Sequence, residues 1–158
     1  MKRTSSRATQ REGGEAFLFR GTSTGFPGHP GLQRLSLTPA TTDPIVATLF
    51  ATESANFGFG VVHIATHGEL TGVEIVAGNV LATLEKEVAI RIKPREFAQK
   101  AGLTLIAAEA RNILRNIGIA LPHRIANKAR LSEILHTSPR LTQEQIFEFV
   151  RQARGLKR

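Results

Sequence analysis

An alternating segment in the middle of the chain constrains the fold most strongly. Between residues 84 and 92 the even-numbered positions are apolar except for Lys86, whereas Glu85 and Glu87 occupy odd-numbered positions. This period of two predicts a half-buried β-strand with both carboxylates on the same face. Two carboxylates held in this way can serve one chemical site. A solvated polar face has the same pattern, so the rest of the chain must decide between the two interpretations.

Length and composition predict one folded domain. The chain has 158 residues and 41% hydrophobic content, which is enough to bury a substantial core. The absence of Cys excludes disulfides and thiolate chemistry. No apolar run reaches membrane-spanning length, and the first residues lack the apolar segment of a signal peptide. We therefore expect a soluble protein with no membrane span and no signal peptide.

The net charge of +8 is unevenly placed. Residues 1–20 hold five basic and two acidic groups (+3), residues 21–109 hold six and eight (−2), and residues 110–158 hold ten and three (+7). The middle of the chain therefore carries the acidic chemistry, whereas the last third is basic. This asymmetry favours an acidic or nucleic-acid partner.

Turn and breaker residues divide the chain into expected elements. Residues 1–14 are polar and basic and predict a flexible arm before a single domain at 15–158. We expect strands at residues 15–20, 35–38, 61–66 and 84–92. The first would end at Arg20, a loop rich in Gly and Pro would follow from Gly21, and Pro39 would stop the second strand.

Capping residues mark the expected helices. Thr42 or Asp43 followed by Pro44 predicts a helix start, and this helix should end near residues 53–56. Later helices are expected over 106–117, 126–135 and from the capping-box pattern at 142–145. Strands dominate the first two thirds and helices the last, which predicts an α+β fold with a helical, basic C-terminal region from about residue 103.

Three separated motifs then occur in a recognisable order. They are Arg20-Gly21 at the end of a strand, Ala40-Thr41-Thr42-Asp43-Pro44 leading into a helix, and Glu85-Lys86-Glu87 at the start of a strand. This order resembles the arginine–serine–glutamate class of mono-ADP-ribosyltransferases, which includes many bacterial toxins. The resemblance covers roughly residues 17–92. It implies an ADP-ribosyltransferase-like split β-sheet around an NAD cleft, with NAD as the substrate.

The resemblance implies a role for each motif residue. Glu87 would stabilise the oxocarbenium-like centre that forms as nicotinamide leaves, and Glu85 would orient or deprotonate the incoming nucleophile. Arg20 would bind the pyrophosphate of NAD through bidentate donors, and Gly21 would let the backbone approach the nicotinamide amide.

The middle motif departs from the family pattern of Ser-Thr-Ser or Ser-Thr-Thr, because Ala40 stands at the first position. Thr41, or Thr42 one residue later, would supply the hydroxyl that supports Glu87 and the cleft. Thr42 and Asp43 are equally well explained as helix-capping residues.

Two phenylalanines follow the helix that begins at Pro44. Phe57 and Phe59 lie in a Gly-rich segment that predicts a turn. By resemblance, a loop at this place covers the nicotinamide, and one of the two rings would stack on it. A satellite core position explains a Phe between glycines equally well.

Two other kinds of site compete with this interpretation. His63 and His67 have a spacing that suits zinc on a helix, but the segment predicts a strand and no third ligand is evident. A non-enzymatic nucleic-acid-binding module is the rival from another class. Its phosphate contacts would come from Arg111, Arg115, Arg124, Lys128, Arg130, Arg140, Arg151, Arg154, Lys157 and Arg158.

The function expected from the resemblance is a toxin or effector that moves ADP-ribose from NAD to a macromolecular acceptor. The two-glutamate motif implies a protein arginine as the first expectation, with RNA such as ribosomal RNA as the alternative. An NAD glycohydrolase, in which water replaces the acceptor, is a third possibility. The family context implies delivery as part of a larger secreted polypeptide, action in a target-cell cytoplasm, and a neutralising immunity protein as partner.

Overall fold

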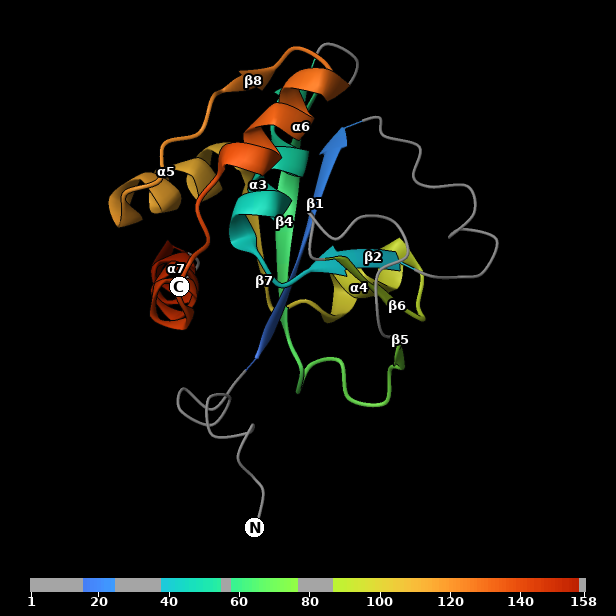
Figure 1. The fold of residues 1–158 in the computed structure, drawn as a ribbon. Helices are drawn as coiled ribbons and strands as arrows, with labels where there is room; N and C mark the ends of the chain where they lie inside the picture. The colour runs from blue at the N-terminus through green and yellow to red at the C-terminus, as the bar shows by residue number, and fades with distance from the viewer. Residues whose placement is uncertain (1–15, 25–37, 55–57, 77–86, 157–158) are drawn as a thin grey trace.

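The described part of the chain has an α+β fold, which confirms the predicted class (Figure 1). The computed structural model describes residues 16–24, 38–54, 58–76 and 87–156. The strands are β1 (Phe17–Thr24), β2 (Thr38–Thr41), β3 (Glu53–Ser54), β4 (Gly58–Thr66), β5 (Ile75–Val76), β6 (Glu87–Ile90), β7 (Leu103–Ile106) and β8 (Arg124–Ile125). The helices are α3 (Pro44–Ala51), α4 (Pro94–Lys100), α5 (Ala107–Ile117), α6 (Lys128–Thr137) and α7 (Gln143–Leu156).

Six of the described strands form one antiparallel sheet, in the order β5-β6-β2-β1-β4-β7. β1 pairs with β4 along its whole length, and β2 pairs with β6 through all four of its residues. Between β1 and β2, however, the described backbone pairs only at Phe19 and Thr41. The sheet therefore consists of two three-stranded half-sheets joined at one residue pair, which we call the junction.

The two faces of the sheet carry different hydrophobic clusters. On one face Phe19 and Ile64 pack with side chains from α3, α5 and α7, including Leu49, Leu114 and Phe149. Figure 1 shows α3 lying along β1 and β4, with α5 and α7 further to one side. Because these helices share one cluster with the strands, the C-terminal helical region packs onto the sheet.

The opposite face has a smaller cluster centred on helix α4. Phe97 of α4 is fully buried against Leu18, Ala65 and Ile90, which come from three different strands. Leu18 and Phe19 are consecutive and belong to different clusters, as the alternation of a strand requires. The next residue, Arg20, therefore belongs to the face that carries α4.

Strand β1 continues through Gly21 to Thr24, so the prediction that it ends at Arg20 and opens a loop at Gly21 was wrong. Gly21 pairs with Val62 of β4, and a Cβ at this position would overlap the carbonyl oxygen of Ala47 in α3. The missing side chain is what allows α3 to lie directly on β1. The glycine that suggested a loop marks a close approach of two backbones.

Strand β2 passes through Pro39, which was wrongly predicted to stop a strand. The carbonyl oxygen of Pro39 accepts a hydrogen bond from the Arg20 side chain on β1. The N–H and C=O of one strand residue point to the same side of the strand. The carbonyl of Pro39 points toward β1, so the N–H that proline lacks would also have pointed toward β1. Backbone pairing with β1 does not extend to Pro39, so the proline removes no ladder bond. Residues 35–37 lie outside the described residues.

Helix α3 begins as predicted. Pro44 occupies its first position, and the Asp43 carboxylate accepts a hydrogen bond from the Ile45 N–H at 2.8 Å. The helix ends at Ala51, before the predicted 53–56, because Glu53 and Ser54 form β3 and pair with β8. Seven of its eight residues are buried, which confirms that this helix belongs to the core.

The helical C-terminal region begins at residue 107, not at about 103. Residues 103–106 form β7, which pairs with β4 and places Ile106 opposite Val61. Ile106 was expected to begin the helix over 106–117, but it ends β7 and its residue surface is 54% exposed. Leu103 and Leu105 are two residues apart, which fits the period of a strand and not a helical stripe, and both pair with β4.

The remaining helix predictions are confirmed, with small shifts of their ends. Helix α5 ends at Gly118 in a left-handed conformation with φ 104°. The capping box forms at the start of α7, where Thr142 and Gln145 exchange hydrogen bonds of 2.8 and 3.1 Å. No helix in the described ranges is both long enough and apolar enough to cross a membrane. The predicted arm at 1–14 falls outside those ranges.

Candidate functional site

Thr41 lies at the junction and has a partner on each side. It pairs with Phe19 on β1 and with Glu87 on β6. In an antiparallel pair the Cα atoms of opposite residues lie about 4.5–5.5 Å apart. The register therefore brings the second motif into direct contact with the third, as the sequence prediction required for Thr41 and Glu87. The side chain of Glu87 lies outside the described atoms.

The surroundings of Thr41 distinguish it from Thr42. Thr41 is only 5% exposed, and its Oγ1 accepts a hydrogen bond from the Asp43 N–H at 3.1 Å. A hydroxyl can accept one hydrogen bond and donate another at the same time. Thr42 is exposed in the bend before α3, and the capping role belongs to Asp43. Thr41 is thus the threonine that can orient a neighbouring carboxylate.

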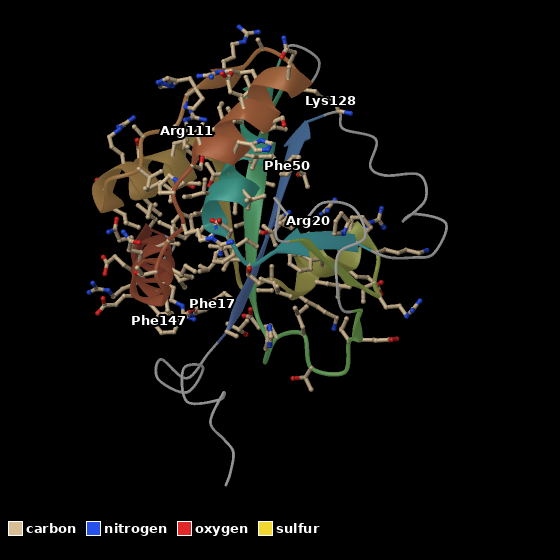
Figure 2. All side chains as sticks on the ribbon, viewed as in Figure 1. Phe17, Arg20, Phe50, Arg111, Lys128 and Phe147 are labelled. Carbon is tan, nitrogen blue, oxygen red and sulfur yellow. The ribbon has the colours of Figure 1, made fainter. Side chains whose placement is uncertain are left out.

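Arg20 connects the two half-sheets through its side chain. Its Nη1 donates to the carbonyl oxygen of Pro39 at 2.9 Å, two residues before Thr41 on β2. Figure 2 shows Arg20 beside β2, between the two half-sheets. Arg20 approaches β2 from the face that carries α4, whereas Thr41 pairs with Phe19 of the other face. The structure brings Arg20 and Thr41 to the same junction, from opposite faces of the sheet.

His63 is a neighbour of Arg20 that the sequence interpretation did not find. The two residues are directly paired on β1 and β4, and His63 Nδ1 shares a 2.8 Å hydrogen bond with Thr104 Oγ1 on β7. Burial, and secondly the positive charge of Arg20, lower the pKa of His63 from its ordinary value of 6.5. The alternation of 17–24 and of 58–66 indicates two strands, but it does not set the register that pairs Arg20 with His63.

The remaining candidates fall in different places. Gly21 lies under α3, where its backbone contacts helix α3. Phe59 lies within β4, so the predicted turn at this residue was wrong. The strand extends to Gly58 because Gly58 and Gly60 pair with residues 24 and 23 of β1. Phe57 and Glu85 lie outside the described residues.

The two histidines considered as metal ligands have different surroundings. His63 bonds to Thr104, whereas His67 is exposed in the turn after β4. Among the described residues, no three His, Cys, Asp or Glu side chains gather in a way that could hold a metal ion.

The basic residues of the C-terminal region do not all belong to one surface. Arg111 is only 6% exposed, and burial lowers its pKa, with a second contribution from the charge of Arg115. It is therefore excluded from the proposed phosphate-binding set. Arg154 lies over the ring of Phe17, 5.7 Å from its centroid. Of the candidate phosphate-binding residues in the described range, those that are exposed are Arg115, Arg124, Lys128, Arg130, Arg140, Arg151 and Arg154.

Two of these exposed arginines are neutralised within their own helices. Arg130 pairs with Glu133 at 2.8 Å, and Arg151 pairs with Glu148. Figure 2 shows Lys128 and Arg111 among the helices, at a distance from Arg20. Lys128, one of the exposed basic residues, therefore lies away from the junction. Lys157 and Arg158 lie outside the described residues.

Comparisons with protein-family models, with characterised proteins and with solved structures gave no match to this chain. The functional interpretation accordingly depends on the residues and their geometry.

Proposed function

We propose that this protein is a mono-ADP-ribosyltransferase that uses NAD, and that the junction of the half-sheets is its NAD site. The observation that carries the proposal is the double pairing of Thr41 with Phe19 and Glu87. It makes neighbours of the strands that bear Arg20, Thr41 and Glu87, although the three motifs lie far apart in the sequence. A sheet divided at the same place also supports the split architecture that the resemblance implies.

In this proposal the bond between C1′ of the ribose and the nicotinamide nitrogen breaks, and its electron pair leaves with nicotinamide. The acceptor nucleophile then bonds to C1′ and gives up a proton. Glu87 stabilises the positive charge that develops on the ribose, and Glu85 receives the proton. Thr41 donates its hydroxyl proton to the Glu87 carboxylate and so fixes its orientation.

Arg20 is assigned to the pyrophosphate of NAD. A guanidinium carries five N–H donors, so the bond to Pro39 is compatible with a bidentate contact to a phosphate. The same bond fixes the guanidinium at the edge of the junction before a ligand arrives. Pre-positioning lowers the entropy that the side chain loses on binding.

The acceptor is proposed to be a protein arginine, as the Glu85-Lys86-Glu87 pattern implies by resemblance. RNA is the second candidate, because the exposed basic residues lie outside the junction and would contact phosphates of a bound acceptor. Transfer to water alone would make the protein an NAD glycohydrolase. By the same resemblance, a toxin or effector context would add a neutralising immunity protein as a partner.

The decisive experiment measures nicotinamide release from NAD by the pure protein and by Glu87→Gln. Glu144→Gln is the control, because it makes the same change at an exposed position on α7. We expect release by the wild type and by the control, and at least about a hundredfold less by Glu87→Gln. The absence of release by the wild type, with and without cell lysate, would reject the enzyme proposal.

The acceptor is identified with NAD labelled in its ADP-ribose portion. After incubation with cell lysate, label in protein that hydroxylamine or an arginine-specific hydrolase removes would support arginine transfer. Label in the RNA fraction that ribonuclease releases would support the second acceptor. Nicotinamide release without label in either fraction would identify a glycohydrolase.

A further inference from the structure

A row of polar side chains crosses the half-sheet β1-β4-β7. Arg20, His63 and Thr104 are direct cross-strand partners on consecutive strands and therefore lie on one face, side by side. All three are partly exposed, and the 2.8 Å bond between His63 and Thr104 fixes one side of the imidazole ring. The row places a cation, an imidazole and a hydroxyl within reach of a single small ligand.

The position of the row on the sheet leaves it open on one side. The neighbouring row, Leu18 and Ala65, is buried under Phe97 of α4. The row on the other side contains Val61, which is partly exposed, and Ile106, which is 54% exposed. The polar row thus lies where the cover of α4 ends, between a buried apolar row and a partly exposed row that also contains Thr22.

The electrostatics of the row fit an anion. Arg20 is the charged group that faces His63 from β1, and Thr104 faces it from β7 without a charge. Burial, and secondly the Arg20 charge, lower the pKa of His63 and so favour the neutral imidazole. An anion between the two side chains would offset the charge of Arg20 and favour protonation of His63. Anion binding at this row would then be coupled to the uptake of a proton.

We propose that Arg20, His63 and Thr104 together form a binding site for a phosphate-type anion. If the function proposed above holds, on which this assignment of the ligand rests, the anion is the pyrophosphate of NAD. In the sheet, β1 lies between β2 and β4, so His63 on β4 and strand β2 flank Arg20 on opposite sides. The phosphates would therefore lie over β1 and β4, on the face of the sheet that carries α4.

The test uses inorganic pyrophosphate, which needs no catalytic activity. Its affinity for the wild type, His63→Gln and Thr104→Val is measured by calorimetry, and thermal melting verifies that each variant is folded. His67→Gln is the matched control, since His67 is exposed four residues away. We expect His63→Gln to bind pyrophosphate about tenfold more weakly than the wild type, because it loses a charged hydrogen bond. The affinity of His67→Gln for pyrophosphate should be unchanged. Equal affinity in His63→Gln and the wild type would overturn the proposal.

A second measurement needs no substitution at the row. The imidazole resonances of the wild type are titrated with pH, with and without saturating pyrophosphate, and assigned by comparison with the two histidine variants. We expect pyrophosphate to raise the pKa of His63. A His63 pKa that does not respond to pyrophosphate would overturn the site.

The results also separate this site from the proposed enzyme. Weaker pyrophosphate binding in His63→Gln, in a protein that does not cleave NAD, would support the anion site and reject the transferase. An active enzyme in which His63→Gln leaves both pyrophosphate affinity and the KM for NAD unchanged would support the transferase and reject the site. If both proposals are correct, His63→Gln raises the KM and leaves kcat nearly unchanged.

Discussion

Nη1 of Arg20 lies 2.9 Å from the carbonyl oxygen of Pro39, so a side chain of β1 bonds to the backbone of β2 where their ladder has ended. The carbonyl oxygen of Pro39 thus has a partner on β1, although Pro39 has no N–H to donate. The contact also holds the guanidinium at the junction, where the three motif strands meet. One residue thereby contributes to the integrity of the sheet and to the proposed binding of NAD.

Arg20→Lys should reduce both stability and NAD affinity. Lysine keeps the charge but cannot combine the bond to Pro39 with a bidentate phosphate contact. We expect a loss of about 1 kcal/mol in the free energy of unfolding and weaker NAD binding, measured by denaturant unfolding and by calorimetry. Arg95→Lys, at an exposed position in α4, is the control. NAD affinity equal to that of the wild type would remove Arg20 from the site.

The two glutamates should separate hydrolysis from transfer. Glu87→Gln is expected to lower nicotinamide release at least about a hundredfold, because a group that stabilises developing charge acts on every route. Glu85→Gln is expected to spare release to water and to abolish transfer of label to the acceptor. Parallel measurements of nicotinamide and of labelled acceptor decide this. An equal loss of both activities in Glu85→Gln would show that the assigned roles are wrong.

Thr41→Val should destabilise the fold, because Oγ1 accepts the hydrogen bond from the buried Asp43 N–H. Leaving that N–H without its acceptor costs about 1–3 kcal/mol of unfolding free energy. Thr41→Ser retains the hydroxyl and should keep most of the stability and the nicotinamide release. If Thr41→Ser behaved like Thr41→Val, the methyl group rather than the hydroxyl would be the important part of the side chain.

Gly21→Ala and Gly155→Ala should have opposite effects on stability. A Cβ at Gly21 would overlap the backbone of Ala47, so helix α3 must move away from β1, which we expect to cost more than about 2 kcal/mol. A Cβ at Gly155 meets no atom within 4 Å, and alanine there should stabilise α7 by about 0.5–1 kcal/mol. Thermal unfolding of both variants measures the difference. A neutral Gly21→Ala would contradict the close approach of α3.

Protonation of His63 should destabilise the native state. Because its pKa is lower in the folded protein than its ordinary 6.5, the unfolded chain binds the additional proton first as pH falls. The contribution of His63 to stability is complete above pH 6.5 and is lost as pH falls through the lowered pKa. His63→Gln should therefore show a weaker decline in stability over this range than the wild type. Parallel stability curves for the two proteins would contradict the pKa shift.

Local patterns predicted correctly those elements whose causes are local. Asp43 followed by Pro44, Gly118, and the Thr142–Gln145 capping box each marked a helix boundary that the structure confirms, because capping satisfies backbone groups within a few residues. Predictions failed where a distant partner decided the outcome. Gly21 and Pro39 were read as ends of strands, since nothing nearby in the sequence reveals that α3 lies against one and that Arg20 bonds to the other.

The sequence by itself determined the α+β class, the order of the three motifs and the residue types suited to NAD chemistry, since side-chain periodicity and functional groups are written in the chain. Tertiary structure alone decided that Thr41 pairs with Glu87, that β1 and β2 meet at one residue pair, and that His63 lies beside Arg20. Those relationships depend on strand register. Register is set by burying side chains of distant segments against one another, and a shift of one residue would exchange the two faces.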